Sequence, residues 1–336
     1  MEGLAKNYIT KVHIELTRFC NLNCQYCMNQ KDGTKLESKI FIRLLDELAE
    51  AGAFYLTLTG GEPFTLNNIF YYIEQARDRG FRVDILSNAT LITRDMAQRL
   101  FDYGVNDVGV SLYGANEETY EAFTGRRMFQ KAVEGVNNLL AAGLKVFISY
   151  NINKITCNDT PLINDMFADK HNVVMKYSTG VSAGRHCDMT LTKCQMPLEQ
   201  ILPKLRQWGI ETKTSEKPVE PPCTINDPLP CHAGTERCYI AADGKVFPCA
   251  VYPVEAGNIH KQPFQEIWRK SECFNTLRRL RIEDYTDCSL CEFRKTCVFR
   301  CPALSQAQRK NPAKCPVEIY TNVKTLHKFW EGDHDK

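Results

Sequence analysis

Short runs of alternating hydrophobic and polar residues are separated by longer amphipathic stretches through the first half of the chain. The alternating runs are rich in β-branched and aromatic residues and are predicted to be strands: 11–17, 54–59, 81–87, 107–112, 145–153 and 172–178. The amphipathic stretches are predicted to be helices and include residues 36–51, 66–79, 93–103 and 129–142. Each of these helices is followed by a glycine suited to a helix C-cap: Gly52, Gly80, Gly104 and Gly143. This alternation of strands and helices predicts a parallel βα array.

The two faces of the predicted strands differ in polarity. The apolar faces of the first, second and fifth strands comprise Val12, Ile14 and Leu16; Phe54, Leu56 and Leu58; and Val146, Ile148, Tyr150 and Ile152. We expect helices to cover these faces and polar side chains to line the interior. A closed eight-stranded barrel fills its interior with branched apolar residues, so six units with a polar interior predict an α/β fold with an open, partial (β/α)6 barrel of the TIM type. Half-exposed antiparallel strands would alternate similarly, but the intervening helices argue against them.

The composition changes after about residue 197. Residues 213–222 hold Pro218, Pro221 and Pro222 among charged residues, which is typical of a linker. We therefore expect a barrel over residues 1–210, a bridging region and cysteine-rich domain over 211–316, and a C-terminal helix and tail over 317–336.

Charge and hydropathy exclude several classes of protein. Lysine and arginine number 42 and aspartate and glutamate 40, and a net charge of +2 argues against binding to nucleic acid or a membrane surface through bulk charge. No apolar run approaches the ~20 residues of a membrane-spanning helix. The first residues lack the apolar segment of a signal peptide, so we expect a cytoplasmic protein with no nucleic-acid or membrane partner.

Cysteine is the unusual residue in this composition. The chain has 16 cysteines, many in clusters, and a cytoplasmic compartment disfavours disulfides. Clustered thiols in such a protein indicate metal binding.

Three cysteines follow the first predicted strand directly. Cys20, Cys24 and Cys27 have the spacing C-x3-C-x2-C. Three thiolates can hold three irons of a [4Fe–4S] cluster and leave the fourth iron open, whereas a structural zinc site needs four ligands. The C-terminal end of a barrel strand is where barrel enzymes place their chemistry.

This triplet, with Tyr26 as the aromatic residue before the third cysteine, resembles the signature of the radical S-adenosylmethionine (radical SAM) superfamily. The resemblance implies that the open iron binds S-adenosylmethionine, which one-electron reduction cleaves to a 5′-deoxyadenosyl radical. Gly60, Gly61 and Glu62, after the second strand, resemble the family's GGE element, which engages the methionine amino group. In isolation these residues would indicate only a turn after a strand.

Four further residues resemble family contacts to S-adenosylmethionine. Ser87 and Asn88 end the third strand, Ser111 lies in the fourth, and Arg126 follows Gly125. The alternatives are strand-end side chains satisfied within the protein and a solvated loop charge.

The C-terminal cysteines form a second pattern. Cys231 precedes Gly244-x4-Cys249, and Cys288-x2-Cys291-x5-Cys297-x3-Cys301 precedes Cys315. This order resembles the SPASM domain, named for subtilosin, pyrroloquinoline quinone, anaerobic sulfatase and mycofactocin maturation. The resemblance implies two auxiliary [4Fe–4S] clusters, and so three clusters in all. A zinc-stabilised binding module is the alternative that is not an enzyme.

The resemblance also implies the ligand sets. Cys288, Cys291, Cys297 and Cys315 would hold the distal auxiliary cluster, and Cys231, Cys249 and Cys301 the proximal one. Its fourth ligand is Cys238, which we favour, or Cys223, unless that position is open. The remaining thiols, apart from the unused member of that pair, are either buried apolar residues or a hydrogen-atom donor: Cys157, Cys187, Cys194 and Cys273.

Relatives with this arrangement modify ribosomally made peptides. We therefore expect an oxidoreductase or maturase that forms a thioether or carbon–carbon crosslink in a precursor peptide, or performs related C–H abstraction. Ala250 stands where sulfatase maturases carry an aspartate, which disfavours formylglycine formation. The alternative is a small-molecule decarboxylase or dehydrogenase, for example one acting on a tetrapyrrole side chain.

Two partners follow from the resemblance. Because the first strand begins at Lys11, we expect no leader-binding domain before it, so a separate protein delivers the peptide or the barrel binds it directly. A flavodoxin or ferredoxin is the expected electron donor.

Overall fold

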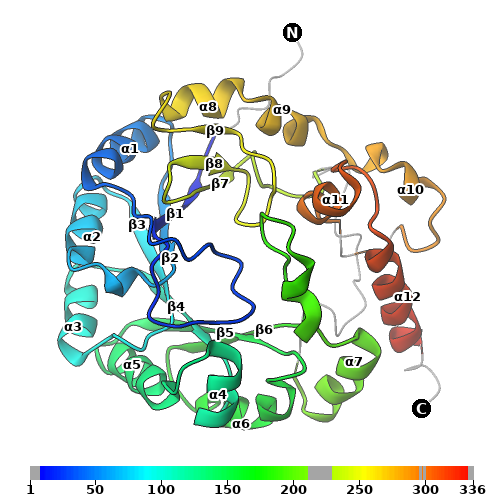
Figure 1. Cartoon of the computed structure of the whole chain (residues 1–336), viewed down its shortest axis with the longest axis horizontal. Helices are drawn as coiled ribbons and strands as arrows, with labels where there is room; N and C mark the ends of the chain where they lie inside the picture. The colour runs from blue at the N-terminus through cyan, green and yellow to red at the C-terminus, as the bar shows by residue number, and fades with distance from the viewer. Residues whose placement is uncertain (1–7, 211–228, 295–296, 298–299, 332–336) are drawn as a thin grey trace.

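A single nine-stranded sheet organises the protein (Figure 1). The computed structural model describes residues 8–210, 229–294, 297 and 300–331. The strand order is β6-β5-β4-β3-β2-β1-β7-β8-β9. The strands are β1 (Lys11–Thr17), β2 (Tyr55–Gly60), β3 (Arg82–Ser87), β4 (Asp107–Leu112), β5 (Lys145–Asn151), β6 (Val173–Ser178), β7 (Arg237–Ile240), β8 (Lys245–Phe247) and β9 (Gly257–Asn258). Strands β1 to β6 are parallel, which confirms the predicted βα array.

Helices cover the outer face of this curved sheet. In Figure 1, α1, α2, α3, α5 and α6 surround β1 to β6, and α8 and α9 lie outside β7 to β9. The helices are α1 (Ser38–Glu50), α2 (Ile69–Asp78), α3 (Arg94–Asp102), α4 (Glu117–Thr124), α5 (Phe129–Ala141), α6 (Thr160–Phe167), α7 (Leu198–Gln207), α8 (Phe264–Lys270), α9 (Glu272–Arg279), α10 (Thr286–Ser289), α11 (Pro302–Arg309) and α12 (Val317–Glu331).

Helix α1 shows why these segments are helical. Its buried residues, Phe41, Leu44, Leu45 and Leu48, recur every three or four positions and form one apolar face. The chain leaves the helix through Gly52, whose φ of 91° is in the left-handed region that glycine favours. The glycines predicted to follow three other helices also have positive φ.

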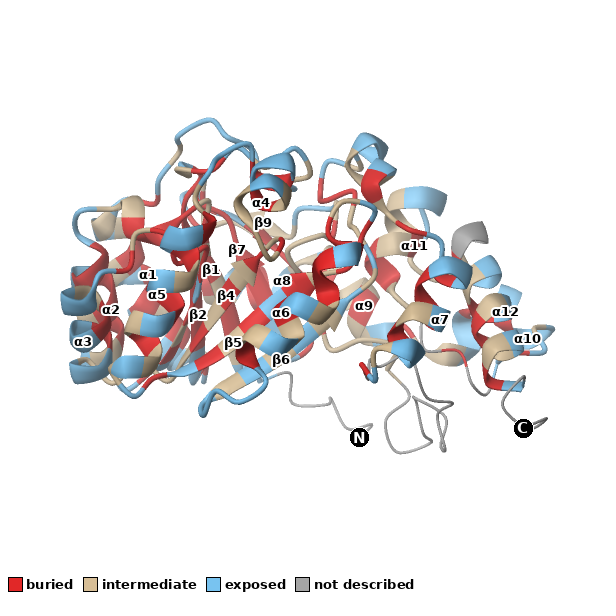
Figure 2. Ribbon diagram, turned by 90° about the horizontal axis from the view of Figure 1, so that it is seen from below, coloured by how far each residue is buried: buried red, intermediate tan, exposed pale blue. Residues whose placement is uncertain are grey.

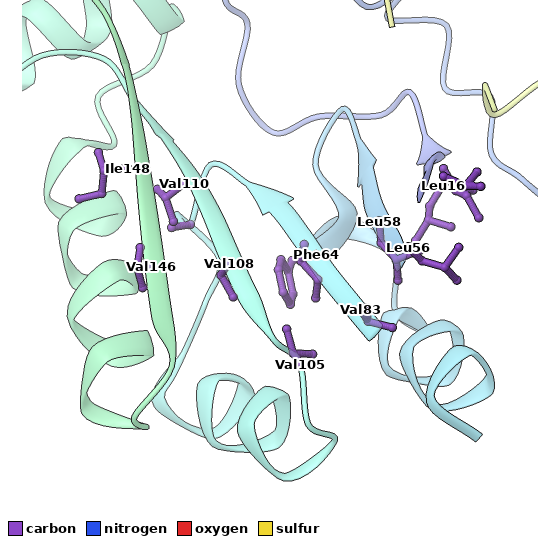
Figure 3. Packing of buried hydrophobic residues seen from close by; sticks show 14 of the residues in the cluster. Leu16, Leu56, Leu58, Phe64, Val83, Val105, Val108, Val110, Val146 and Ile148 are labelled. Atoms are coloured by element: carbon purple, nitrogen blue, oxygen red, sulfur yellow. The ribbon is translucent and has the colours of Figure 1, made fainter. Parts of the chain in front are cut away.

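The apolar faces of the strands form the main core together with the helices (Figures 2 and 3). Val146 and Ile148 on β5 are fully buried, as the alternation predicted, and so are Val108 and Val110 on β4. The prediction that Phe54 belongs to the buried face of the second strand is wrong. Strand β2 begins one residue later, at Tyr55, and Phe54 is 50% exposed.

The cysteine-rich region contributes directly to the barrel sheet, which the sequence analysis did not predict. Strand β7 pairs in parallel with β1, so that Val12 lies opposite Cys238 and His13 opposite Tyr239. Strands β8 and β9 then continue the sheet antiparallel. The first strand of the barrel therefore lies between the two parts of the protein.

The C-terminal helix packs against the preceding part of the chain. Helix α12 packs against α7, and its residues Leu326 and Trp330 join the main core. The Arg206 guanidinium lies 4.0 Å from the Phe329 ring centroid. Among the residues that the structure describes, none of the helices has the length and apolar character required to cross a membrane.

Candidate active site

The three-cysteine loop leaves β1 and is held against the end of β2. The Gly61 amide donates to the Thr17 carbonyl oxygen at 2.6 Å, and the Glu62 amide donates to that of Phe19 at 2.9 Å. A Cβ atom at Gly60 would lie 2.5 Å from the Thr17 oxygen, and one at Gly61 would lie 2.3 Å from the Phe19 oxygen. These glycines are therefore required by the backbone of the loop itself, a role that the sequence analysis did not assign to them.

Helix α4 holds the other side of the loop. The Asn23 amide donates to the Thr124 carbonyl oxygen at 2.8 Å, at the C-terminus of α4. The Lys31 ammonium donates to Asn23 Oδ1 at 2.8 Å and to the Cys24 carbonyl oxygen at 3.1 Å. The middle of the loop is thus fixed from two directions, by residues that the sequence analysis did not identify.

Asn88 fixes the start of the cysteine triplet. Its Nδ2 donates to Asn21 Oδ1 at 2.9 Å and lies 3.8 Å from the Cys20 sulfur. Asn21 in turn donates to Thr90 Oγ1 at 2.8 Å. The structure therefore brings Asn88 to the cysteine loop, while Asn21 and Thr90 are further site residues that no spacing pattern indicates.

The Glu62 carboxylate faces protein donors. Its Oε1 accepts from the Ser87 hydroxyl at 2.9 Å and from the Phe64 amide at 3.1 Å, and its Oε2 accepts from the Asn88 amide at 2.7 Å. Burial raises the pKa of Glu62 to about 7 although all three donors lower it. Glu62 and Ser87 therefore connect the end of β2 to β3, and the contacts to S-adenosylmethionine that the resemblance implied for them stay a prediction.

The remaining predicted contact residues are Tyr26, Ser111 and Arg126. The Tyr26 ring packs against Phe123 with centroids 5.6 Å apart, and Phe123 stacks on Tyr113 at 4.3 Å. Ser111 is half-buried on β4, and Arg126 is exposed between α4 and α5.

The thiols of the triplet interact electrostatically with one another. Burial, with smaller contributions from the neighbouring Cys27 and Cys20, raises the pKa of Cys24 to about 12. The Leu22 amide donates to the Cys20 sulfur at 3.4 Å, an arrangement that favours a thiolate. The Tyr120 hydroxyl is buried without a hydrogen-bond partner, and among charged groups Cys24 acts on its pKa most strongly. A buried, unpaired hydroxyl whose strongest charged neighbour is Cys24 fits an iron–sulfur cluster at this position.

A second group of cysteines lines a cavity in the C-terminal region. The cavity has a volume of about 390 Å³, and its lining includes Cys288, Cys291, Cys297 and Cys315. Burial raises the pKa of Cys315 to about 11, with Cys288 as the strongest charged neighbour. The structure thus brings together the four cysteines that the resemblance assigned to one auxiliary cluster.

A third group consists of Cys231, Cys249 and Cys301. Burial raises the pKa of Cys249 to about 11, with further contributions from Cys301 and Cys231. The amide two residues after each cysteine donates to its sulfur, as from Ala233 to Cys231 at 3.4 Å. This repeated donor position is what thiolate ligands require.

Cys238, the fourth ligand that we favoured, is placed in the main core, and its role as a ligand stays a prediction. It is 2% exposed on β7 and belongs to the main core, on the same face as Ile240. Burial raises the pKa of its thiol, and the only charged group that acts on it is Arg278. The alternative ligand, Cys223, lies outside the described residues.

The fold and these sites define an iron–sulfur protein built on a partial barrel, and comparisons with known proteins identify its family. The profile of the Radical SAM superfamily matches residues 14–158, and that of an iron–sulfur cluster-binding domain, SPASM, matches residues 231–297. The AdoMet-dependent heme synthase of Methanosarcina barkeri is 31% identical over 314 residues, covering 84% of this chain and 88% of its own length. This chain belongs to the radical SAM superfamily and carries a SPASM domain.

Two other proteins show how widely this architecture is used. The PqqA peptide cyclase of Bradyrhizobium diazoefficiens is 26% identical over 304 residues, covering 84% of this chain and 79% of its own length. The crystal structure of SuiB from Streptococcus suis with S-adenosylmethionine has the same fold, with a TM-score of 0.73 at 17% identity over 93% of this chain and 77% of that one. SuiB has also been crystallised with its precursor peptide SuiA. Our chain is thus a radical SAM enzyme that uses S-adenosylmethionine and iron–sulfur clusters.

Proposed function

We propose that Cys20, Cys24 and Cys27 hold a [4Fe–4S] cluster at the mouth of the barrel and that this site performs the reductive cleavage of S-adenosylmethionine. The observation that carries the proposal is the fixed loop after β1, which presents three half-buried thiols with no fourth cysteine in the same loop. When bound, the cofactor supplies a carbon-centred radical that removes a hydrogen atom from the substrate. The protein contributes the geometry: Asn88 holds the first cysteine, and α4 holds the backbone near the second.

We assign the other cysteines to two auxiliary [4Fe–4S] clusters. Cys288, Cys291, Cys297 and Cys315 form the distal set, and Cys231, Cys249 and Cys301 form three ligands of the proximal set. Cys238 and Cys223 remain the two candidates for the fourth ligand, and the burial of Cys238 in the main core favours Cys223. The proposed contacts to S-adenosylmethionine are Tyr26, Gly60, Gly61, Glu62, Ser87, Asn88, Ser111 and Arg126. A flavodoxin or ferredoxin is the proposed electron donor.

We propose a small molecule of the tetrapyrrole class as the substrate, with oxidation of a propionate side chain as the reaction. The heme synthase relative, which matches both parts of this chain, supports this choice. The side chain would lose one hydrogen atom to the cofactor-derived radical, one electron to an auxiliary cluster, and carbon dioxide, leaving a vinyl group. The reaction balances only if an acceptor takes up the electron that the substrate radical loses. The cluster proposed at Cys231, Cys249 and Cys301 would be that acceptor.

A precursor peptide is the second candidate. The peptide cyclase relative and the crystal structure of SuiB with its precursor peptide support it. In that case the same hydrogen abstraction and the same electron transfer would form a crosslink.

One experiment tests the reaction and separates the two substrates. The full chain, reconstituted without oxygen, is incubated with S-adenosylmethionine, dithionite and iron coproporphyrin III, and the products are separated by mass spectrometry. Loss of carbon dioxide and two hydrogens from a propionate, with stoichiometric 5′-deoxyadenosine, supports the tetrapyrrole proposal. Formation of 5′-deoxyadenosine with no change in the porphyrin would overturn that substrate and direct the search to peptides.

A further inference from the structure

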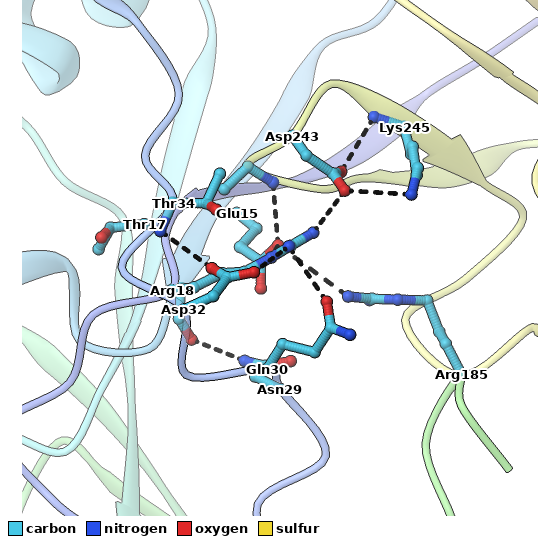
Figure 4. A network of polar contacts seen from close by, with 12 residues as sticks. Glu15, Thr17, Arg18, Asn29, Gln30, Asp32, Thr34, Arg185, Asp243 and Lys245 are labelled. Atoms are coloured by element: carbon cyan, nitrogen blue, oxygen red, sulfur yellow. Dashed lines mark hydrogen bonds and ion pairs between the residues drawn. The ribbon is translucent and has the colours of Figure 1, made fainter.

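A cluster of charged residues, centred on three buried side chains, connects the three-cysteine loop to the SPASM region (Figure 4). We call it the Arg18 cluster, and it consists of Glu15, Arg18, Asp32, Arg185 and Asp243. The side chains of Arg18 and Arg185 are each 6% exposed and that of Glu15 is fully buried. These residues come from β1, the loop after it, the segment after β6, and the turn between β7 and β8.

Arg18 joins three carboxylates from different parts of the chain. Its guanidinium lies 3.3 Å from Glu15 Oε2, 2.9 Å from Asp32 Oδ2 and 2.9 Å from Asp243 Oδ2. Arg18 precedes Cys20 by two residues, while Asp243 belongs to the hairpin that leads to Cys249. One side chain therefore connects the start of the cysteine loop to the hairpin of the SPASM region.

Arg185 extends these contacts to the proximal auxiliary site. Its Nη1 donates to the carbonyl oxygen of Ala250, the residue after Cys249, at 3.0 Å. Its Nη2 lies 4.0 Å from Glu15 Oε2, the same oxygen that Arg18 approaches. The guanidinium also lies over the rings of Tyr239 and Phe247, at 4.6 and 5.1 Å from their centroids.

The segment that carries Arg185 also touches the other side of the cysteine loop. A Cβ atom at Gly184 would lie 2.9 Å from the Cβ of Met28, the residue after Cys27. Glu15 Oε2 also accepts from the Ala242 amide at 2.9 Å, on the hairpin. The contacts therefore run without a gap from Cys20 through Arg18, Glu15 and Arg185 to Ala250 and Cys249.

Net stabilisation of the fold does not explain this arrangement. Burying ion pairs costs desolvation, and apolar residues of similar volume stabilise a protein as well or better. A buried ionic network instead fixes the relative placement of the segments that it connects, because each hydrogen-bond donor has a fixed direction. Here the geometry is the placement of Cys249 relative to Cys20.

We propose that Arg185 and Arg18 are positioning residues that set the separation and orientation of the two iron–sulfur sites at Cys20 and Cys249. This inference rests on the proposed ligand sets of the two sites but not on the identity of the substrate. The fixed placement matters because electron transfer from a substrate held between the sites slows steeply with distance.

The test uses electron paramagnetic resonance (EPR) of the full chain, reconstituted without oxygen and reduced stepwise. Arg185→Met removes the donor to Ala250 and the charge while retaining the length of the side chain. The control is Lys245→Met, because Lys245 contacts Asp243 at 3.4 Å from the exposed side. We expect Arg185→Met to retain wild-type iron content, to shift the midpoint potential of the proximal cluster to more negative values and to change its magnetic interaction with the first cluster. Lys245→Met should change neither property.

Asp243→Asn provides a second variant in case Arg185→Met does not fold. It weakens the Arg18 contact with little change of shape and is expected to alter the magnetic interaction with a smaller change in potential. Unchanged spectra and potentials in both variants, with lowered thermal stability alone, would show a merely structural role and overturn the inference. Loss of the first cluster in the wild-type protein would instead contradict the proposed function.

Discussion

Gly61 and Phe19 approach so closely that no side chain fits between them: a Cβ at Gly61 would lie 2.3 Å from the Phe19 carbonyl oxygen. The contact fixes the first residues of the cysteine loop against the end of β2. The GGE element thus acts in this structure through the backbone of the cluster loop, before any contact with a cofactor is considered.

We predict that Gly61→Ala displaces the cysteine loop and destabilises the protein by about 1–3 kcal/mol, because the backbone must move to admit the methyl group. The first cluster should then be lost more readily than the auxiliary ones. Iron content and thermal unfolding measured under anaerobic conditions check this. Gly180→Ala is the control, since nothing lies within 4 Å of a Cβ at that position. Equal behaviour of the two variants would contradict the role assigned to Gly61.

Asn88→Ala should release Asn21 and Cys20 together, because Asn88 contacts both. We expect slower formation of 5′-deoxyadenosine and faster loss of the first cluster under a chelator. Asn138→Ala is a suitable comparison, since Asn138 donates to the Ile92 carbonyl oxygen on an outer helix. If the two variants lost iron at the same rate, Asn88 would have no specific role at the loop.

Substitution of the SPASM cysteines should divide them into ligands and core residues. Cys301→Ala is expected to lower the iron content and to change the EPR signals, because its thiol belongs to the proximal set. Cys238→Ala should leave iron unchanged and destabilise the protein by about 1 kcal/mol through the lost core contacts. Loss of iron in Cys238→Ala would restore Cys238 as a ligand.

His13 predicts a pH dependence of stability. Burial, together with Lys11 and Arg237, lowers its pKa from 6.5 to about 4, so the native state keeps this histidine neutral. Above pH 6.5 the histidine is neutral in both the folded and the unfolded state. As the pH falls from 6.5 toward 4, the unfolded state binds a proton that the folded state does not, and the free energy of unfolding falls by up to about 3 kcal/mol. His13→Gln should therefore flatten the stability profile between pH 4 and 6.5 in anaerobic thermal denaturation. A profile parallel to that of the wild type would rule out His13 as its source.

The sequence predicted the parts of the protein that depend on periodicity and spacing. Alternation along β1 to β6 located the strands. The predicted burial of Phe54 was wrong because β2 begins one residue later than expected, which leaves Phe54 outside the strand. The spacing of Cys20, Cys24 and Cys27 predicted that they lie close together, because a short loop holds its own residues near one another. Which thiols hold each auxiliary cluster stays a prediction.

Contacts between distant segments required the structure. Arg18 was not identified as a site residue, because a charge in a sequence does not indicate which carboxylates it meets, and Asp243 is 225 positions away. The position of Cys238 on a buried strand also required the structure, because Cys238, Tyr239 and Ile240 are all buried on β7 and show no alternation that sequence analysis could use.

The central claim is that the loop of Cys20, Cys24 and Cys27 carries the cluster that cleaves S-adenosylmethionine. The most direct measurement is 5′-deoxyadenosine formed by the reconstituted wild-type chain and by Cys24→Ala, with dithionite and without oxygen. We predict formation in the wild type and none in the variant, which should still retain the iron of the auxiliary sites. Equal formation in both proteins, or none in a wild-type protein that holds its full iron and sulfide, would contradict the account.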